Sequence, residues 1–178
     1  MPTSAVAAST RWRRRRAEVV ALRIFLLGLA VAVVIFNVDQ FVKIKLIDHV
    51  QAAGGYIEVT PFFNLVMVWN RGISFGMFQT GDTGRWVLIA LTGAIAVGLL
   101  VWLWRVQTRL LACALGAVIG GAVGNIVDRV VYGAVADFFD FHVAGYHWPA
   151  FNVADSAIVV GVAIMLLDSL FAKDDAHK

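Results

Sequence analysis

Four long apolar runs stand out along the chain, and each can cross a lipid bilayer as a helix. A spanning helix needs about 20 mostly apolar residues, and the runs cover residues 19–41, 86–104, 110–127 and 152–172. The second run is the clearest, because no charged residue lies between Arg85 and Arg105. The fourth is less uniform, since it contains Asp155 and Asp168. The pattern predicts an all-α polytopic membrane protein with four transmembrane helices in a single membrane domain, residues 1–178.

Two longer segments, 42–85 and 128–151, join the first run to the second and the third to the fourth. Within the first segment, residues 56–60 and 63–68 are rich in β-branched and aromatic residues, and Pro61 separates them. Short runs of this kind, bounded by turn-forming residues, are typical of strands. We expect a small β-sheet or hairpin here, lying on the membrane.

Composition and charge agree with this architecture and add an orientation. Hydrophobic residues make up 60% of the chain, charged residues only 15%, and mean hydropathy is +0.79, which is too apolar for a soluble domain. Basic residues concentrate in the start (1–18), the connection 105–109 and the tail 173–178, all on one side of four crossings. Because basic residues favour the cytoplasmic side, both termini are predicted to be cytoplasmic and the two polar segments extracytoplasmic. The basic block therefore indicates topology rather than a nucleic-acid partner.

The basic start and the apolar run behind it also match the outline of a secretory signal peptide. The run is long, however, and no small-residue cleavage site follows it closely. We interpret it as a retained signal-anchor helix, with a cleaved signal as the alternative.

Glycines recur every four residues in the third run, at Gly116, Gly120 and Gly124. This spacing gives a helix a flat face on which another backbone can pack closely. A phosphate-binding loop is disfavoured, because the lysine and hydroxyl residues of such a loop do not follow.

Several ionisable residues lie in or beside the apolar runs, where lipid makes them costly and where they indicate function or pairing. Asp39 and Lys43 are four positions apart at the outer end of the first run, on one helix face. We favour a structural ion pair over direct chemistry for these two. Asn125, Asp128 and Arg129 follow at the outer end of the third run. They fit either a structural network or contact with a substrate.

Two further acids, Asp137 and Asp155, are expected at a similar depth near the outer interface. Asp137 follows the third run among apolar residues, and Asp155 lies at the outer start of the fourth. If the helices bring them together, two carboxylates share a site of low dielectric, and one of them keeps its proton. That arrangement suits an aspartic protease, in which one carboxylate activates water and the other carboxyl group polarises the scissile carbonyl. Asp155 alone also fits a helix N-terminal acid that the helix dipole favours.

Other chemistries and other classes of protein have less support in the sequence. The single cysteine, Cys113, lies inside an apolar run, and the four histidines (His49, His142, His147 and His177) lack metal-ligand spacing. We therefore expect neither a metal nor an organic cofactor. A transporter or proton relay usually places its acids near the bilayer midplane rather than at one end. A non-enzymatic scaffold, in which the acids only hold helices together, is the third alternative.

Four short blocks follow one another along nearly the whole chain: Val38–Lys43, Trp69–Phe75, Gly120–Arg129 continued by Val135–Phe138, and Phe151–Asp155. Together and in this order they resemble the type II, or lipoprotein, signal peptidases of bacteria. The resemblance implies an aspartic endopeptidase with Asp137 and Asp155 as its catalytic pair. One departure is the bulk of Arg71 and Ile73, which bears on contacts near the mouth of the site.

The same resemblance implies supporting roles for other polar residues. Asp128 supports the catalytic pair, while Asp39 and Lys43 brace the first helix against the site. The residues implied to line the site and to hold the substrate or the pair are Asn70, Gly72, Asn125, Arg129 and Asn152.

A substrate and a location also follow from the resemblance. The implied substrate is a prolipoprotein whose cysteine carries a diacylglyceryl thioether, cut on the N-terminal side of that cysteine. The enzyme would work as a monomer among the lipids of the bacterial inner membrane, with its active site near the outer face. Backbone pairing with the β-favouring segment 55–70 could hold the extended substrate.

Overall fold

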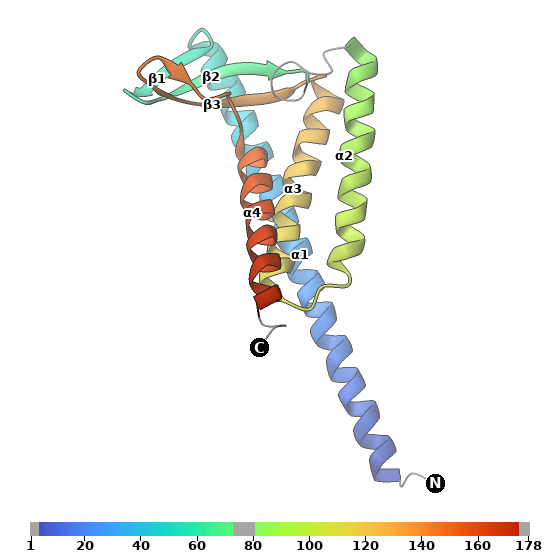
Figure 1. Cartoon of the computed structure of the whole chain (residues 1–178). Helices are drawn as coiled ribbons and strands as arrows, with labels where there is room; N and C mark the ends of the chain where they lie inside the picture. Colours follow the sequence, from blue (N-terminus) through green and yellow to red (C-terminus); the bar gives the residue numbers. More distant parts are fainter. Residues whose placement is uncertain (1–3, 73–80, 175–178) are drawn as a thin grey trace.

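The computed structural model describes residues 4–72 and 81–174, which form four helices and a small antiparallel sheet (Figure 1). The elements, in chain order, are α1 (Ser4–Ala52), β1 (Tyr56–Thr60), β2 (Phe63–Asn70), α2 (Gly81–Leu103), α3 (Arg109–Val131), β3 (Val135–Val143), β4 (Tyr146–His147) and α4 (Val153–Asp174). The predicted class, a helical membrane protein with a small β element, is confirmed.

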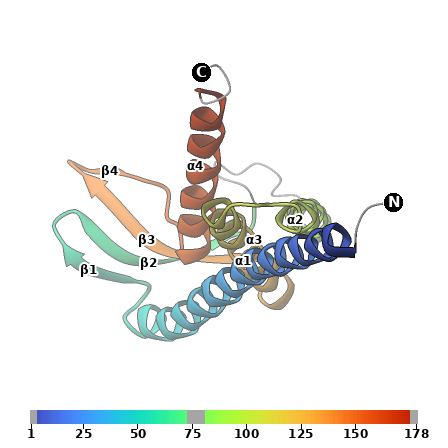
Figure 2. The same cartoon turned by 90° about the horizontal axis from the view of Figure 1, so that it is seen from below.

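Helix α3 is the centre of the bundle, and the other three helices pack around it (Figure 2). The predicted glycine face makes this possible on the side of α1. A side chain at Gly116 or Gly120 would collide with the carbonyl oxygens of Gly28 and Ala32 on α1. The two backbones therefore approach as closely as the glycine spacing predicts.

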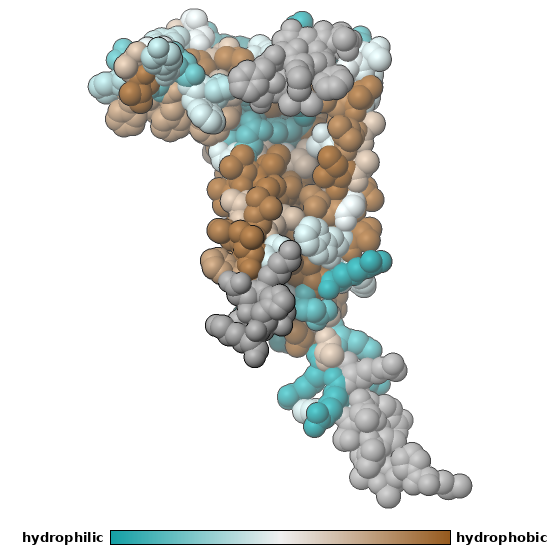
Figure 3. Space-filling view, in the orientation of Figure 1, coloured by the Kyte–Doolittle hydropathy of each residue, from teal (hydrophilic) through white to brown (hydrophobic). Residues whose placement is uncertain are grey.

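All four helices are long and apolar enough to cross a membrane. Hydrophobic side chains cover the helical body, whereas hydrophilic residues gather near the sheet and towards the start of α1 (Figure 3). The start of α1 and the end of α4 lie at the opposite end of the molecule from the sheet (Figure 1). This is a multi-pass membrane protein.

Helix α1 is longer than the sequence predicted. It has 49 residues, and it continues through both flanks of the apolar run 19–41. Hydropathy marks only the part of a helix that lies in lipid, whereas arginine and lysine favour helix in water as well. The helix ends before Gly54 and Gly55, whose φ angles of +84° and +89° are rarely adopted by residues other than glycine.

The sheet has the order β1-β2-β3-β4 and projects to one side of the helices (Figures 1 and 2). β1 and β2 match the two predicted strands, and β2 runs on to Asn70. β3 and β4 come from segment 128–151, where the sequence analysis expected no strands. The β element is therefore a four-stranded sheet built from both segments, 42–85 and 128–151, rather than a hairpin from the first.

Candidate active site

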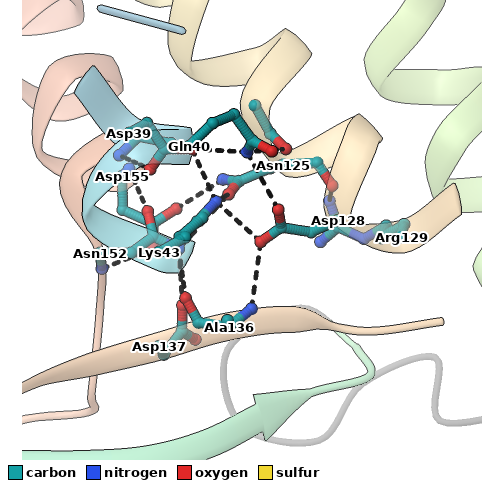
Figure 4. A network of polar contacts seen from close by, with 12 residues as sticks. Asp39, Gln40, Lys43, Asn125, Asp128, Arg129, Ala136, Asp137, Asn152 and Asp155 are labelled. Carbon is teal, nitrogen blue, oxygen red and sulfur yellow. Dashed lines mark hydrogen bonds and ion pairs between the residues drawn. The ribbon is translucent and has the colours of Figure 1, made fainter. Parts of the chain in front are cut away.

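The two acids singled out from the sequence come together where β3 crosses the helix ends next to the sheet (Figures 1 and 4). Asp137 lies on β3, and Asp155 lies in the first turn of α4. Asn152 touches both of them. Its Nδ2 donates to Asp137 Oδ1 at 2.7 Å, and its backbone N–H donates to Asp155 Oδ2 at 3.3 Å.

Asp137 is buried among amide donors. Its side chain is 1% exposed, and Asn70 Nδ2 donates to its second carboxylate oxygen at 3.0 Å. Burial, followed by the negative charge of Asp155, raises the pKa of Asp137 to about 7. The hydrogen bonds from Asn70 and Asn152 and the charge of Lys43 lower this pKa, but they do not cancel the rise. This carboxyl group therefore exchanges its proton near neutral pH.

Asp155 takes part in a reciprocal cap at the start of α4. Its backbone N–H donates to Asn152 Oδ1 at 2.9 Å, while its carboxylate accepts from the backbone of Asn152. This geometry is a capping box, so the helix-terminal role considered from the sequence describes part of its environment. Its other oxygen, Oδ1, accepts from Asn125 Nδ2 at 2.8 Å, which links it to α3.

A buried ion cluster lies next to the two acids (Figure 4). Lys43 Nζ is 2.8 Å from Asp39 and 2.8 Å from Asp128, and all three side chains are at most 2% exposed. The ammonium group also donates to Asn125 Oδ1 at 3.1 Å. Buried charges destabilise a protein unless each is paired, and here one cation serves two carboxylates.

The cluster also holds the backbone next to each acid. Asp39 Oδ1 accepts from the N–H of Ala154 at 2.9 Å, and Asp128 Oδ2 accepts from the N–H of Ala136 at 3.2 Å. These residues immediately precede Asp155 and Asp137. Gln40, which the sequence analysis did not single out, donates to both carboxylates of the cluster, at 3.2 and 3.1 Å. The ion cluster therefore sets the position of both acids through their neighbours.

The remaining candidate residues contact the site less directly. Arg129 Nη1 donates to the carbonyl oxygen of Asn125 in its own helix at 3.3 Å, and its buried Nε has no partner among the described residues. The N–H of Gly72 donates to Asn70 Oδ1 at 3.1 Å, which orients the amide so that its Nδ2 faces Asp137. Ile73, part of the departure noted in the sequence, lies outside the described residues.

Within residues 4–72 and 81–174, histidine, cysteine and acidic side chains form no group of three or more that could hold a metal ion. Two carboxyl groups and three asparagine amides meet at this site, next to the ammonium ion of Lys43 and its two carboxylate partners. Such a set can share one proton between the carboxyl groups and orient both of them towards a water molecule.

Comparison with known proteins gives one family. The family described as "Signal peptidase (SPase) II" matches residues 31–171. The chain is 44% identical to a lipoprotein signal peptidase of Methylobacterium sp. (strain 4-46), over 85% of this chain and 93% of that protein. A lipoprotein signal peptidase of Cupriavidus taiwanensis is 43% identical over 94% of this chain and 96% of its own.

The fold has solved counterparts as well. A bacterial membrane enzyme solved in meso at 2.3 Å resolution superposes with a TM-score of 0.70 and 29% identity, covering 85% of this chain and 90% of that one. A second, at 1.9 Å resolution, gives a TM-score of 0.67 over 80% of this chain and 92% of that one. With the family match over residues 31–171, these likenesses show that the chain belongs to the signal peptidase II family of membrane proteases.

Proposed function

We propose that this protein removes the signal peptide from diacylglyceryl-modified prolipoproteins by cutting on the N-terminal side of the lipidated cysteine, with Asp137 and Asp155 as its catalytic pair. The family and the names of the relatives support the prolipoprotein as substrate. The observation that carries the proposal for the pair is that both acids are hydrogen-bonded to Asn152 in a largely buried site.

In this mechanism the two carboxyl groups have different roles. Asp137, whose pKa lies at about 7 because of burial and the charge of Asp155, carries the proton and donates a hydrogen bond to the scissile carbonyl oxygen. Ionised Asp155 takes a proton from water, and the hydroxide oxygen bonds to the carbonyl carbon. The tetrahedral intermediate then collapses, the C–N bond breaks, and the nitrogen of the departing cysteine receives a proton from the pair. No covalent enzyme intermediate forms.

The asparagines support the pair in different ways. Asn70 and Asn152 donate to Asp137, and Asn125 donates to Asp155, so each carboxylate keeps a fixed orientation. Arg129 has N–H donors beyond its bond to the carbonyl of Asn125, and we assign these to a substrate carbonyl oxygen.

We place the site near the outer face of the bacterial inner membrane, with both termini in the cytoplasm and the enzyme acting as a monomer. The Arg-rich start supports this orientation. The test uses single cysteines at exposed Tyr146 on β4 and exposed Gln107 between α2 and α3, after Cys113→Ala. A membrane-impermeant thiol reagent added to intact cells is expected to label position 146 and not 107. The reverse pattern would overturn the orientation.

Cleavage by the purified protein in detergent tests the function. The substrates are a diacylglyceryl-modified prolipoprotein and the same precursor without lipid, and mass spectrometry identifies the new N-terminus. The lipidated precursor should yield a product beginning at the modified cysteine, while the unmodified precursor stays intact. Cleavage at another bond, equal cleavage of both precursors, or a folded enzyme that cuts neither would contradict the proposal.

A further inference from the structure

A row of hydrogen-bonded polar side chains crosses the sheet away from the two acids, with one residue on each strand. Tyr56 on β1 donates its hydroxyl to Asn64 Oδ1 on β2 at 3.0 Å. Asn64 Nδ2 donates to Asp140 Oδ2 on β3 at 2.9 Å, and His147 Nδ1 on β4 lies 2.9 Å from the same carboxylate. Asn64 and Asp140 are 1% and 5% exposed. Burying these polar side chains costs desolvation free energy that an apolar pair in the same space would not, so their burial indicates a role that only polar side chains can fill.

The register of β2 against β3 indicates that role. Asn64 pairs with Asp140, but between Leu65 and Val68 the register shifts. Three steps along β2 there match two along β3, from Leu65 opposite Phe139 to Val68 opposite Asp137, so one extra residue is accommodated. The strand then continues to Asn70, which donates to Asp137. A further slip by one residue would turn Asn70 to the other face of the sheet.

Beside the backbone ladder, aromatic side chains also meet across β2 and β3 at this end. Phe63 packs on Phe141 and Phe139 with ring centroids 4.7 and 6.1 Å apart. Such contacts are weakly directional and tolerate displacement, whereas an amide donating to a carboxylate tolerates little. The Asn64–Asp140 bond is therefore a directional side-chain contact that favours one register of the backbone ladder before the shift.

We propose that Asp140, held by Asn64, is a positioning residue of the enzyme: it fixes the register of β2 on β3 so that Asn70 meets Asp137. This inference rests on the proposed function, because it gives Asp140 a role in the chemistry at Asp137. Asp140 does not touch the reacting atoms.

The electrostatic environment of Asp140 fits this role. Burial alone would raise the pKa of Asp140, but hydrogen bonds from Asn64 and His147, with the charges of His147 and His142, outweigh it and leave the pKa lowered. An ionised carboxylate holds its donors more strongly than a neutral acceptor does. Asp140→Asn removes the negative charge and leaves one neutral acceptor oxygen, so the bond from Asn64 Nδ2 weakens.

The test is the pH dependence of kcat/KM for Asp140→Asn, Asn70→Ala and the double variant. The hydrogen bond from Asn70 lowers the pKa of Asp137, so its loss raises that pKa and moves the alkaline limb to higher pH. We expect a shift of roughly one pH unit for either single variant and no further shift in the double variant. Exposed Glu58 lies opposite Asn64 on β1, and Glu58→Gln, with the same change of charge, should leave the limb in place.

The possible outcomes separate the inference from the proposed function. A purely structural role for Asp140 would lower kcat or thermal stability without moving the limb, and shifts that add in the double variant would mean independent effects; either result overturns the inference. Should Asp140→Asn not fold, or should its remaining oxygen still hold Asn64, Asn64→Ala takes its place in the same cycle, because it removes the donor of this bond and keeps the carboxylate. Full activity of Asp137→Asn would instead overturn the proposed function.

Discussion

Replacement of Lys43 by methionine tests how strongly the site depends on its buried cation. Methionine fills a similar volume but leaves Asp39 and Asp128 without their shared partner, and both carboxylates are 0% exposed. Breaking a buried ion pair by removing one member typically destabilises a protein by about 3–5 kcal/mol. For a chain of 178 residues, such a loss corresponds to a decrease in Tm of roughly 10 °C.

Thermal unfolding in detergent at pH 7 is the assay. Lys45→Met is the matched control, because Lys45 lies on the same helix as Lys43 but its side chain is exposed rather than buried. Adding Asp128→Asn to Lys43→Met should restore part of the lost stability, since one uncompensated carboxylate then remains instead of two. If Lys43→Met unfolded at the same temperature as Lys45→Met, the assignment of the cluster as the support of the site would be wrong.

Three further predictions concern packing and protonation. Gly124→Ala places a Cβ 2.5 Å from a carboxylate oxygen of Asp39, whereas one at Gly98 meets nothing within 4 Å. Thermal unfolding should therefore show a loss of about 1–3 kcal/mol for Gly124→Ala only, and equal effects at both glycines would refute the packing. Because burial and the charge of Asp155 raise the pKa of Asp137 to about 7, the rate of cleavage should fall above pH 7 as this group loses its proton. A rate that stays constant from pH 6 to 9 would contradict the protonated role. The same raised pKa stabilises the folded protein fully below about pH 4 and loses this contribution as the pH rises to 7, at roughly 1.4 kcal/mol per pH unit. Asp137→Asn should unfold with a weaker pH dependence over this range, and an unchanged slope would show that another group titrates.

The helices could be predicted from the sequence because each contains an apolar run of spanning length. Their ends could not, since the helical segments of α1 outside lipid follow backbone preference rather than hydropathy. Gly54 and Gly55 were available as a stop signal, and they end α1. The sequence analysis did not use them to end the first helix.

The strands of segment 128–151 were not predicted, although a signal was present. Val135–Val143 is rich in valine and phenylalanine, and the turn at Ala144 and Gly145, with φ of +50° and +82°, joins it to β4. The aromatic residues around Asp137 are the signal from which β3 could have been predicted. Without that strand, Asp140 and His147, which depend on cross-strand pairing, were not recognised as partners.

The contacts within the site could be predicted only in part. The spacing of four positions from Asp39 to Lys43 predicted their ion pair, and the pair is present at 2.8 Å. Spacing alone could not bring Asp137 close to Asp155, because β3 and α4 meet through tertiary packing; the order of the four blocks suggested it. The bonds from Ala136 and Ala154 to the ion cluster involve backbone groups, which carry no signal in the sequence.

Cleavage of a diacylglyceryl-modified prolipoprotein by Asp137→Asn and Asp155→Asn, each checked for intact folding, tests whether these two acids are the catalytic pair. Asp168→Asn is the matched control, because it removes an acid further along the same helix as Asp155. We predict that both catalytic variants lose cleavage by at least about a thousandfold while Asp168→Asn cleaves as the parent does. A folded Asp137→Asn or Asp155→Asn variant that cleaves at the parental rate would contradict the assignment of the pair.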